Sequence, residues 1–343
     1  MSSHRIAIAN SDVGFECAEG ESVLDAAARA GIELPYSCRK GVCGNCAGAV
    51  TQGEVAGAGQ GPIANETCLP GQVLFCMCAP RTDLEIAPLS WRRIDPSARK
   101  RFTAKVFRNQ LAADDVSVLQ LRLPAGQRAK FSAGQYLQVA LPDGSTRCYS
   151  MANPPHESDS VTLHVRHVQG GAFSARVAQL APGDLLEIEL PFGAFSLKEA
   201  EARPVVFVAG GTGFAPVKSI LDDMLKRRID RPVTLIWGAR QADGIYLRAA
   251  VARWQKQWPQ LRFIAAIADP GDRGAASGED FAGRPDQALL AAFEDLRGHE
   301  LYCCGSPAMV HAVREAAMQH RGLDAADFHS DVFVEGPAAH AVQ

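Results

Sequence analysis

The sequence predicts a multi-domain chain, with a small cysteine-rich domain, an antiparallel β domain and an α/β domain that has a doubly wound parallel sheet. Three observations predict this order. Seven of the ten cysteines lie within the first 87 of 343 residues. Apolar and polar side chains alternate from about residue 101 to 197, and strands alternate with helices after residue 203. We expect domains at 1–87, 101–199 and 200–335, a linker at 88–100 and a flexible tail at 336–343.

Composition and charge exclude some classes of function. The net charge is −3, whereas a nucleic-acid-binding protein needs a basic surface. The N-terminus lacks the apolar stretch of a signal peptide, and no run approaches the ~18 apolar residues of a membrane span. We therefore expect a cytoplasmic protein without nucleic-acid or membrane partners. In that compartment cysteines are more often metal ligands or free thiols than disulfides.

The cysteine spacing predicts an iron–sulfur cluster. Four residues separate Cys38 from Cys43, two separate Cys43 from Cys46, and Cys76 follows the apolar run 73–75. This is the plant-type 2Fe-2S pattern with a distant fourth ligand. Gly41 and Gly44 let the backbone turn tightly around the cluster. Structural zinc is the alternative, but zinc sites usually pair two short cysteine knuckles.

Residues 1–87 resemble a plant-type ferredoxin domain, an α+β structure with the β-grasp fold. Residues 22–27 and 31–36 carry the resemblance together with the cysteine loop. Cys76 and Cys78 could each supply the fourth ligand, and the resemblance favours Cys76 because it directly follows the strand. It makes Cys17 and Cys68 non-ligands.

The middle of the chain carries a candidate flavin site. Alternating runs at 119–123, 137–141, 161–165 and 186–190 are typical of antiparallel strands. Arg147, Tyr149 and Ser150 follow a Pro-Asp-Gly turn, and residues 170–174 follow another strand. This segment resembles the flavin β-barrel of ferredoxin reductases. The barrel implies FAD, with FMN as the alternative.

The resemblance assigns roles within that barrel. It implies that Arg147 pairs with the FAD pyrophosphate, that Tyr149 lies against the flavin and that Ser150 hydrogen-bonds near N5, which makes Ser150 a candidate catalytic residue. A cation and a helix N-terminus both suit a pyrophosphate. The remaining cradle residues are His164, Val165, Arg166, Gly170, Gly171, Phe173 and Ser174.

The last third predicts a nucleotide site. A strand at 205–208 leads into a turn with Gly211, Thr212 and Gly213 and then into a helix, so the backbone can approach a phosphate at the helix N-terminus. A second strand and turn contain Cys304 and Gly305. Together they resemble the NAD(P) domain of the same reductases.

Further residues of this domain receive roles from the resemblance. Cys304 would lie beside the nicotinamide, and Asp331 and Phe333 would lie near the flavin face. We take these three as candidate catalytic residues. Arg240 would lie at the adenosine ribose, where it could bind a 2′-phosphate.

The three parts together are similar to the reductase component of bacterial ring-hydroxylating Rieske dioxygenases, of the ferredoxin–FAD–NAD(P) type. Within that family the reductases of terephthalate dioxygenases are the most similar, on residues 34–41, 98–105 and 150–158. The resemblance implies that a hydride passes from NAD(P)H to FAD and that single electrons then pass through the 2Fe-2S cluster. The acceptor would be a Rieske non-haem iron oxygenase acting on terephthalate or a related aromatic acid. We expect a monomer, and the resemblance weakly favours NADPH.

Three alternatives stay open. Reductases of di-iron monooxygenases have the same module order. A CDP-6-deoxyglucoseen-type reductase shares the Trp-Gly-Ala-Arg run at 237–240. The third alternative is a redox-sensing binding module with no turnover of its own.

Overall fold

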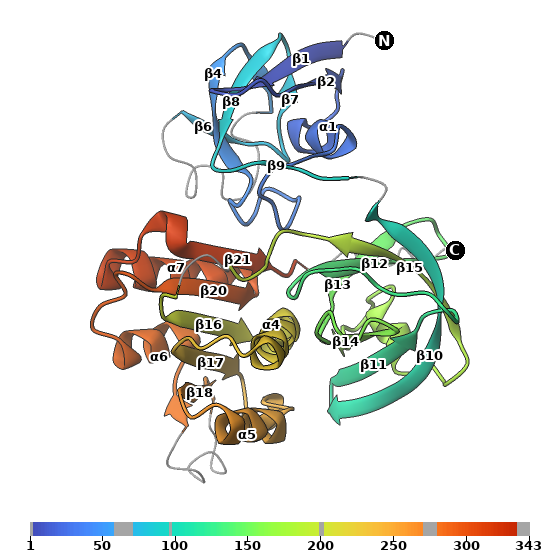
Figure 1. Ribbon diagram of the computed structural model, residues 1–343, viewed down its shortest axis with the longest axis vertical. Helices are drawn as coiled ribbons and strands as arrows, with labels where there is room; N and C mark the ends of the chain where they lie inside the picture. Colours follow the sequence, from blue (N-terminus) through green and yellow to red (C-terminus); the bar gives the residue numbers. More distant parts are fainter. Residues whose placement is uncertain (1–2, 58–70, 96–97, 199–201, 270–279, 335–343) are drawn as a thin grey trace. The chain divides into compact units, whose positions relative to one another are not determined.

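The computed structural model describes residues 3–57, 71–95, 98–198, 202–269 and 280–334. Contacts divide the chain into two compact units, Met1–Arg99 and Lys100–Gln343 (Figure 1). None of the helices in the described ranges combines the length and hydropathy that a membrane span requires. The expected tail at 336–343 and Cys68 lie outside the described residues.

The first unit is an α+β domain, as the sequence predicts. Its sheet has the order β2 (Gly14–Ala18), β1 (Ser3–Ile8), β8 (Leu84–Pro88), β4 (Ala47–Gln52) and β6 (Gln72–Leu74). The single described α-helix of this unit is α1 (Val23–Arg29). Ser22 caps it, because its Oγ accepts the Asp25 N–H at 3.1 Å and satisfies one of the free donors of the first turn.

Part of the segment 88–100, which we expected to be a linker, belongs to the first unit. Strand β9 (Arg92–Arg93) pairs with β3 (Ile32–Glu33), and Arg92 forms an ion pair with the buried Glu33 carboxylate. The Ile94 N–H donates to the Gly31 carbonyl at 2.8 Å. Backbone pairing thus continues beyond residue 88. Two further short strands, β5 (Val55–Ala56) and β7 (Ala79–Pro80), pair with each other.

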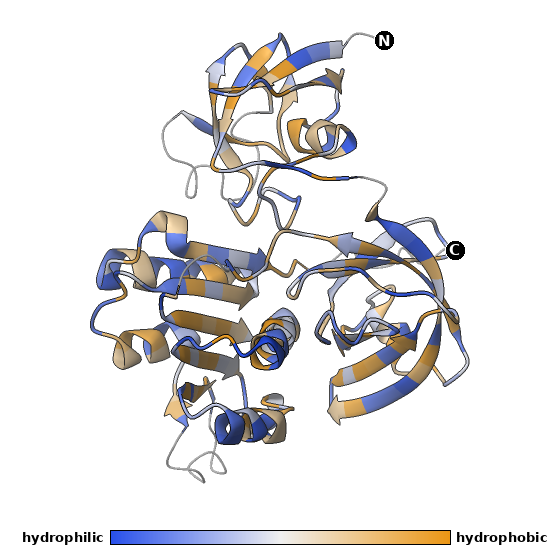
Figure 2. Ribbon diagram, in the orientation of Figure 1, coloured by the Kyte–Doolittle hydropathy of each residue, from blue (hydrophilic) through white to orange (hydrophobic). Residues whose placement is uncertain are grey.

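The first part of the second unit is a closed antiparallel barrel. Its order is β13 (Thr146–Ser150), β12 (Tyr136–Ala140), β15 (Leu185–Phe192), β10 (Lys100–Ala113), β11 (Val116–Arg122) and β14 (Ser160–Arg166). A bridge between Met151 and Leu163 joins the two edge strands. Along β10 hydrophobic and hydrophilic residues alternate, since one face packs on the barrel core and the other faces solvent (Figure 2).

The second part has a parallel sheet. Its order is β19 (Phe281–Ala282), β18 (Leu261–Ile267), β17 (Val233–Ala239), β16 (Val205–Gly210), β20 (Glu300–Gly305) and β21 (Phe328–Val332). Helices α4 (Phe214–Arg227) and α5 (Arg248–Gln257) lie on one face, and α6 (Pro285–Ala292) and α7 (Pro307–Arg321) on the other (Figure 1). The strand order reverses between β16 and β20, and in such sheets ligands bind beyond the carboxyl ends of the strands at this point.

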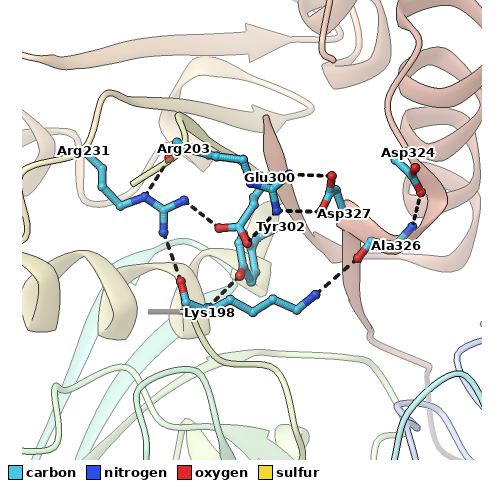
Figure 3. A network of polar contacts seen from close by, with 8 residues as sticks. All are labelled: Lys198, Arg203, Arg231, Glu300, Tyr302, Asp324, Ala326 and Asp327. Atoms are coloured by element: carbon cyan, nitrogen blue, oxygen red, sulfur yellow. Dashed lines mark hydrogen bonds and ion pairs between the residues drawn. The ribbon is translucent and has the colours of Figure 1, made fainter. Parts of the chain in front are cut away.

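An ion-pair network joins the amino ends of the strands in this sheet. Figure 3 shows Arg203, Arg231 and Asp327 around Glu300. The fully buried Glu300 carboxylate lies 2.6 Å from Arg231 and 3.5 Å from Arg203, and Arg203 also pairs with Asp327 at 2.6 Å. The Arg231 guanidinium further donates to the carbonyls of Arg203 and Lys198. The network therefore links the segments that precede β16, β17 and β21 to the first residue of β20.

Replacing the central carboxylate tests this network. Glu300→Gln should lower the free energy of unfolding by about 3 kcal/mol, because it leaves the nearly inaccessible Arg231 charge without its counter-charge. Urea denaturation of the full chain measures the change. Asp295→Asn is the matched control, since it removes an exposed pair with Arg297 at 2.8 Å and should change stability far less. Equal effects of the two substitutions would contradict this account.

Candidate active site

The four cysteines of the predicted cluster lie around one backbone loop. Cys43 and Cys46 are buried, and Cys38 and Cys76 are partly exposed. Backbone N–H groups of Lys40, Val42 and Cys43 donate to the Cys38 Sγ at 3.3–3.4 Å, and the Asn45 N–H donates to Cys43 Sγ at 3.4 Å. The loop therefore presents its donors to sulfur, an arrangement that stabilises thiolates and tunes a cluster potential.

The sulfurs form two pairs. The Cys46 Sγ lies 3.2 Å from the Cys76 Sγ, and a hydrogen bond from the Cys43 thiol lowers the pKa of Cys38. Two pairs of sulfurs suit a cluster of two irons with two thiolates on each.

The structure separates Cys76 from Cys78. The hydrogen bond from Cys46 lowers the pKa of the Cys76 thiol. Cys78 is fully buried, and that burial raises its pKa to about 12. Cys17 is also buried, with a pKa raised to about 11 for the same main reason. The contact between the Cys46 and Cys76 sulfurs favours Cys76 as the fourth ligand.

Strand β13 brings the predicted flavin residues together. Arg147 and Tyr149 are partly buried on alternate positions of this strand, and Ser150 is buried at its end. The Arg147 guanidinium donates to the Thr146 carbonyl at 2.9 Å and to Ser145 Oγ at 3.2 Å. Among the described residues, no carboxylate forms an ion pair with it. Its charge can therefore serve an anionic ligand such as a pyrophosphate.

The other cradle residues divide into two groups. His164 and Arg166 lie on β14 outside the barrel core, whereas the side chains of Val165 and Phe173 pack within that core. Val165 can therefore face a cofactor only with its backbone. The ring centroids of Phe173 and Tyr149 are 5.2 Å apart, so Phe173 supports Tyr149 from the barrel core. Arg166 also forms an ion pair with Asp115 at 2.5 Å.

The loop at 170–174 closes on itself. Gly170 has φ +73°, and a Cβ on Gly171 would lie 2.2 Å from Ser174 Oγ. The same Oγ accepts the Val168 N–H at 3.3 Å. Ser174 begins α3 (Ser174–Val177), which is a single turn. The sequence pattern thus located a tight turn, in which Gly170 adopts a backbone conformation that favours glycine.

The two nucleotide turns meet at the reversal of strand order. A Cβ on Gly213 would lie 2.2 Å from the Cys304 carbonyl oxygen, so the turn after β16 packs directly on the end of β20. Gly211 has φ +53°, and Thr212 lies between these glycines in the 3₁₀ turn η2 (Gly211–Gly213). Backbone N–H groups at a helix start beside such a turn form an anion site.

Met309 is a site residue that sequence reasoning missed. A Cβ on Gly210 would lie 2.4 Å from the Met309 sulfur, and one on Gly305 would lie 2.6 Å from its methyl carbon. Its side chain on α7 thus fills the space between the two turns. No local signal could have found it, since methionine on a helix is ordinarily a core residue.

Cys304, Asp331 and Phe333 lie together at the carboxyl ends of β20 and β21. Cys304 pairs with Asp331 in the sheet register, and the Phe333 N–H donates to the Gly305 carbonyl at 2.9 Å. Cys304 is fully buried, which raises its thiol pKa well above the ordinary value. The thiol is therefore protonated and is a poor nucleophile.

Arg240 lies at the end of the next strand. It directly follows β17, its side chain is exposed, and its carbonyl accepts the Asp269 N–H at 2.8 Å. This position adjoins the glycine turn, so the side chain can reach a ligand extended across the carboxyl ends of the strands.

Polar contacts that the sequence did not predict join the barrel to the parallel sheet. Ser219 Oγ on α4 donates to the Asn153 carbonyl at 2.7 Å, and Lys218 Nζ donates to the Ala152 carbonyl at 3.2 Å. The His164 Nδ1 and the Tyr246 hydroxyl are 2.9 Å apart. Of these contacts, the one between His164 and Tyr246 involves β14, whereas Ser219 and Lys218 contact the segment at 152–153.

Comparison with known proteins agrees with this arrangement. Residues 6–81 match the 2Fe-2S iron-sulfur cluster binding domain, residues 103–197 the oxidoreductase FAD-binding domain and residues 207–315 the oxidoreductase NAD-binding domain. The chain is 59% identical to terephthalate 1,2-dioxygenase, reductase component 2, of a Comamonas species, over 98% of this chain and 99% of that protein. The chain belongs to the family of reductase components of ring-hydroxylating dioxygenases.

More distant relatives serve other systems. A CDP-6-deoxy-L-threo-D-glycero-4-hexulose-3-dehydrase reductase of Yersinia pseudotuberculosis is 33% identical over 91% of this chain and 93% of that protein. The crystal structure of a cytochrome P450 reductase of Amycolatopsis has a TM-score of 0.76 and 31% identity, and covers 98% of this chain and 100% of its own. The reductase thus has a cluster domain, a FAD domain and an NAD domain suited to electron transfer from NAD(P)H.

The cysteine geometry generates a test of the fourth ligand. Cys76→Ser should remove most of the iron and acid-labile sulfide, because it takes away the sulfur 3.2 Å from Cys46. Cys78→Ser is the control and should retain both, since the sulfur in contact with Cys46 belongs to Cys76. Iron and sulfide analysis with the visible spectrum measures the outcome. Loss in the Cys78 variant alone would reverse the assignment.

The flavin cradle generates a second test. Arg147→Ala should weaken FAD binding by roughly ten- to a hundredfold, because a charge-assisted hydrogen bond is worth about 1.5–3 kcal/mol. Titration of the deflavinated protein with FAD measures the dissociation constant. Arg108→Ala removes an exposed arginine on β10 and should leave it unchanged. Unaltered FAD affinity in the Arg147 variant would place the pyrophosphate elsewhere.

Proposed function

We propose that this reductase passes electrons from NAD(P)H to the Rieske oxygenase component of a dioxygenase that acts on terephthalate or a related aromatic acid. The pairing of the four cluster sulfurs in a chain 59% identical to a terephthalate dioxygenase reductase carries the proposal. When bound, the nicotinamide supplies a hydride, FAD accepts the electron pair, and the cluster takes one electron at a time.

The proposed roles follow the geometry of the second unit. Arg147 and the turn at Gly170, Gly171 and Ser174 would hold FAD, with the ring of Tyr149 against the flavin and Ser150 near N5. His164, Val165, Arg166 and Phe173 would complete the cradle. Gly211, Thr212, Gly213 and Gly305 would hold the nicotinamide nucleotide. Cys304, Asp331 and Phe333 would line the place where the nicotinamide meets the flavin. Within Lys100–Gln343, we assign residues 101–199 to FAD and 200–335 to NAD(P).

The cluster is the proposed exit for electrons. Cys38, Cys43, Cys46 and Cys76 would hold it, and Cys38 and Cys76 are partly exposed. Plant-type clusters lie near about −400 mV and Rieske centres above roughly −150 mV. At about 59 mV per tenfold, this gap favours one-electron transfer to the partner by roughly 10⁴-fold. A Rieske acceptor is therefore energetically suitable.

The charge of the first domain and the state of the cysteines support a proposal for the partner contact and the cellular compartment. Residues 1–87 carry ten acidic and five basic side chains, so we propose a partly electrostatic contact with the oxygenase and no nucleic-acid partner. The nine described cysteines are all free thiols, which suits a reducing cytoplasm. We propose a monomer without membrane partners. The exposed Arg240 supports binding of a 2′-phosphate, and thus NADPH.

Reconstitution with the purified oxygenase component of a terephthalate dioxygenase tests the proposed electron path. The intact reductase should support dihydroxylation with either NADPH or NADH, with the lower KM for NADPH. Cys76→Ser should reduce ferricyanide at a near-normal rate, because this small acceptor can reach the flavin, but should lose at least about nine-tenths of oxygenase turnover. Full turnover by the clusterless variant would refute the proposed exit. Activity only with a di-iron monooxygenase would favour that alternative.

A further inference from the structure

Tyr246 joins the flavin barrel to the nucleotide domain. It lies between η3 (Ala242–Gly244) and α5, and its hydroxyl is 2.9 Å from His164 Nδ1 on β14. The two rings meet edge to face, with centroids 5.5 Å apart. His164 is 4% exposed, and its Nε2 has no hydrogen-bond partner among the described residues. Within the described structure, the Tyr246 hydroxyl is thus the group that orients the imidazole.

The ring of Tyr246 also supports the glycine turn. It packs edge-on against Trp237 at 5.1 Å and against Phe214 at 6.4 Å. Trp237 Nε1 donates to the Gly211 carbonyl at 3.1 Å, and its ring stacks on Phe214 at 3.7 Å. Phe214 is the first residue of α4, directly after the turn. Tyr246 therefore contacts both aromatic residues that hold the turn in place.

The glycine turn at Gly211–Gly213 approaches the barrel beside the contact between Tyr246 and His164. A Cβ on Gly211 would lie 2.9 Å from Arg166 Nη2, and Arg166 lies two residues after His164 on the same strand. The turn η2 lies next to β14, and Tyr246 bonds to the same strand at His164. A small shift of the turn would change the distance between ligands bound to the two domains.

The chemical state of the pair favours a lasting hydrogen bond. Burial, with the nearby Lys218 charge as a smaller cause, lowers the pKa of His164 to about 3. The imidazole is therefore neutral near pH 7 and has one nitrogen that accepts a proton donor. Burial also raises the pKa of the Tyr246 hydroxyl, which stays protonated.

We propose that Tyr246 is a positioning residue for hydride transfer: through His164 and Trp237 it sets the separation between the glycine turn and β14. This inference rests on the proposed function, which puts FAD on β13 and β14 and the nicotinamide at the turn. Tyr246 acts through its neighbours and not on the reacting atoms. Because a misplacement of about 1 Å can cost roughly a hundredfold in rate, loss of one hydroxyl should be measurable.

Tyr246→Phe in the full chain, loaded with FAD and cluster, tests the proposal. In stopped-flow mixing with NADPH, the limiting rate of flavin reduction should fall by about tenfold or more, while the apparent dissociation constant of NADPH changes less than about twofold. Ser219→Ala is the matched control. It also removes a hydroxyl hydrogen bond between the two domains, at 2.7 Å to the Asn153 carbonyl, and should leave the limiting rate unchanged.

A hydrogen-exchange measurement and a double-mutant cycle complement the rate measurement. Hydrogen exchange of the segment 205–217 in the absence of nucleotide should be roughly fivefold faster in Tyr246→Phe, as expected for loss of one net hydrogen bond, and unchanged in Ser219→Ala. In a double-mutant cycle with His164→Ala, the second substitution should add little to the first.

The outcomes separate this inference from the proposed function. Wild-type rates and exchange in Tyr246→Phe would overturn the positioning role, as would an equal slowing in Ser219→Ala. If the unaltered protein failed to reduce FAD with either NADPH or NADH, the proposed function would fail, and the exchange comparison would still decide whether Tyr246 holds the turn.

Discussion

The close approach of two backbone turns is the constraint on which the nucleotide site depends. Gly213 lies so near the Cys304 carbonyl that a single Cβ would come within 2.2 Å of it. This contact brings the turn after β16 onto the end of β20, where the strand order reverses. Met309 fills the remaining space beside Gly210 and Gly305. A larger residue at Gly213 would push the two turns apart, because its Cβ would meet backbone atoms.

The opposite end of the same sheet is held by charge. Glu300 is completely buried and pairs with Arg231 and Arg203, which also binds Asp327 (Figure 3). Ion pairs between side chains therefore join the amino ends of the strands, while glycine turns that pack on each other lie at the carboxyl ends. This division leaves the turn backbone at the carboxyl ends of the strands as the place for an anionic ligand.

The cysteine loop uses backbone donors in a comparable way. Several N–H groups donate to Cys38 and Cys43, and the sulfurs of Cys46 and Cys76 lie in contact. Donors of this kind stabilise thiolates, the charged form that binds iron. The contact with the Cys46 sulfur thus distinguishes Cys76 from Cys78, which lies two residues further on.

The sequence by itself determined the three domain types and most of the candidate site. The spacing of Cys38, Cys43 and Cys46, the alternation in the barrel and the strand–glycine–helix pattern are local, and local patterns reflect backbone geometry directly. Only the tertiary structure decided how residues from distant segments meet. Met309, Tyr246 and Ser219 carry no local signal, because their roles arise from packing between elements. The pairing of Arg92 with Glu33 likewise depends on a strand contact across about sixty residues, which no short pattern encodes.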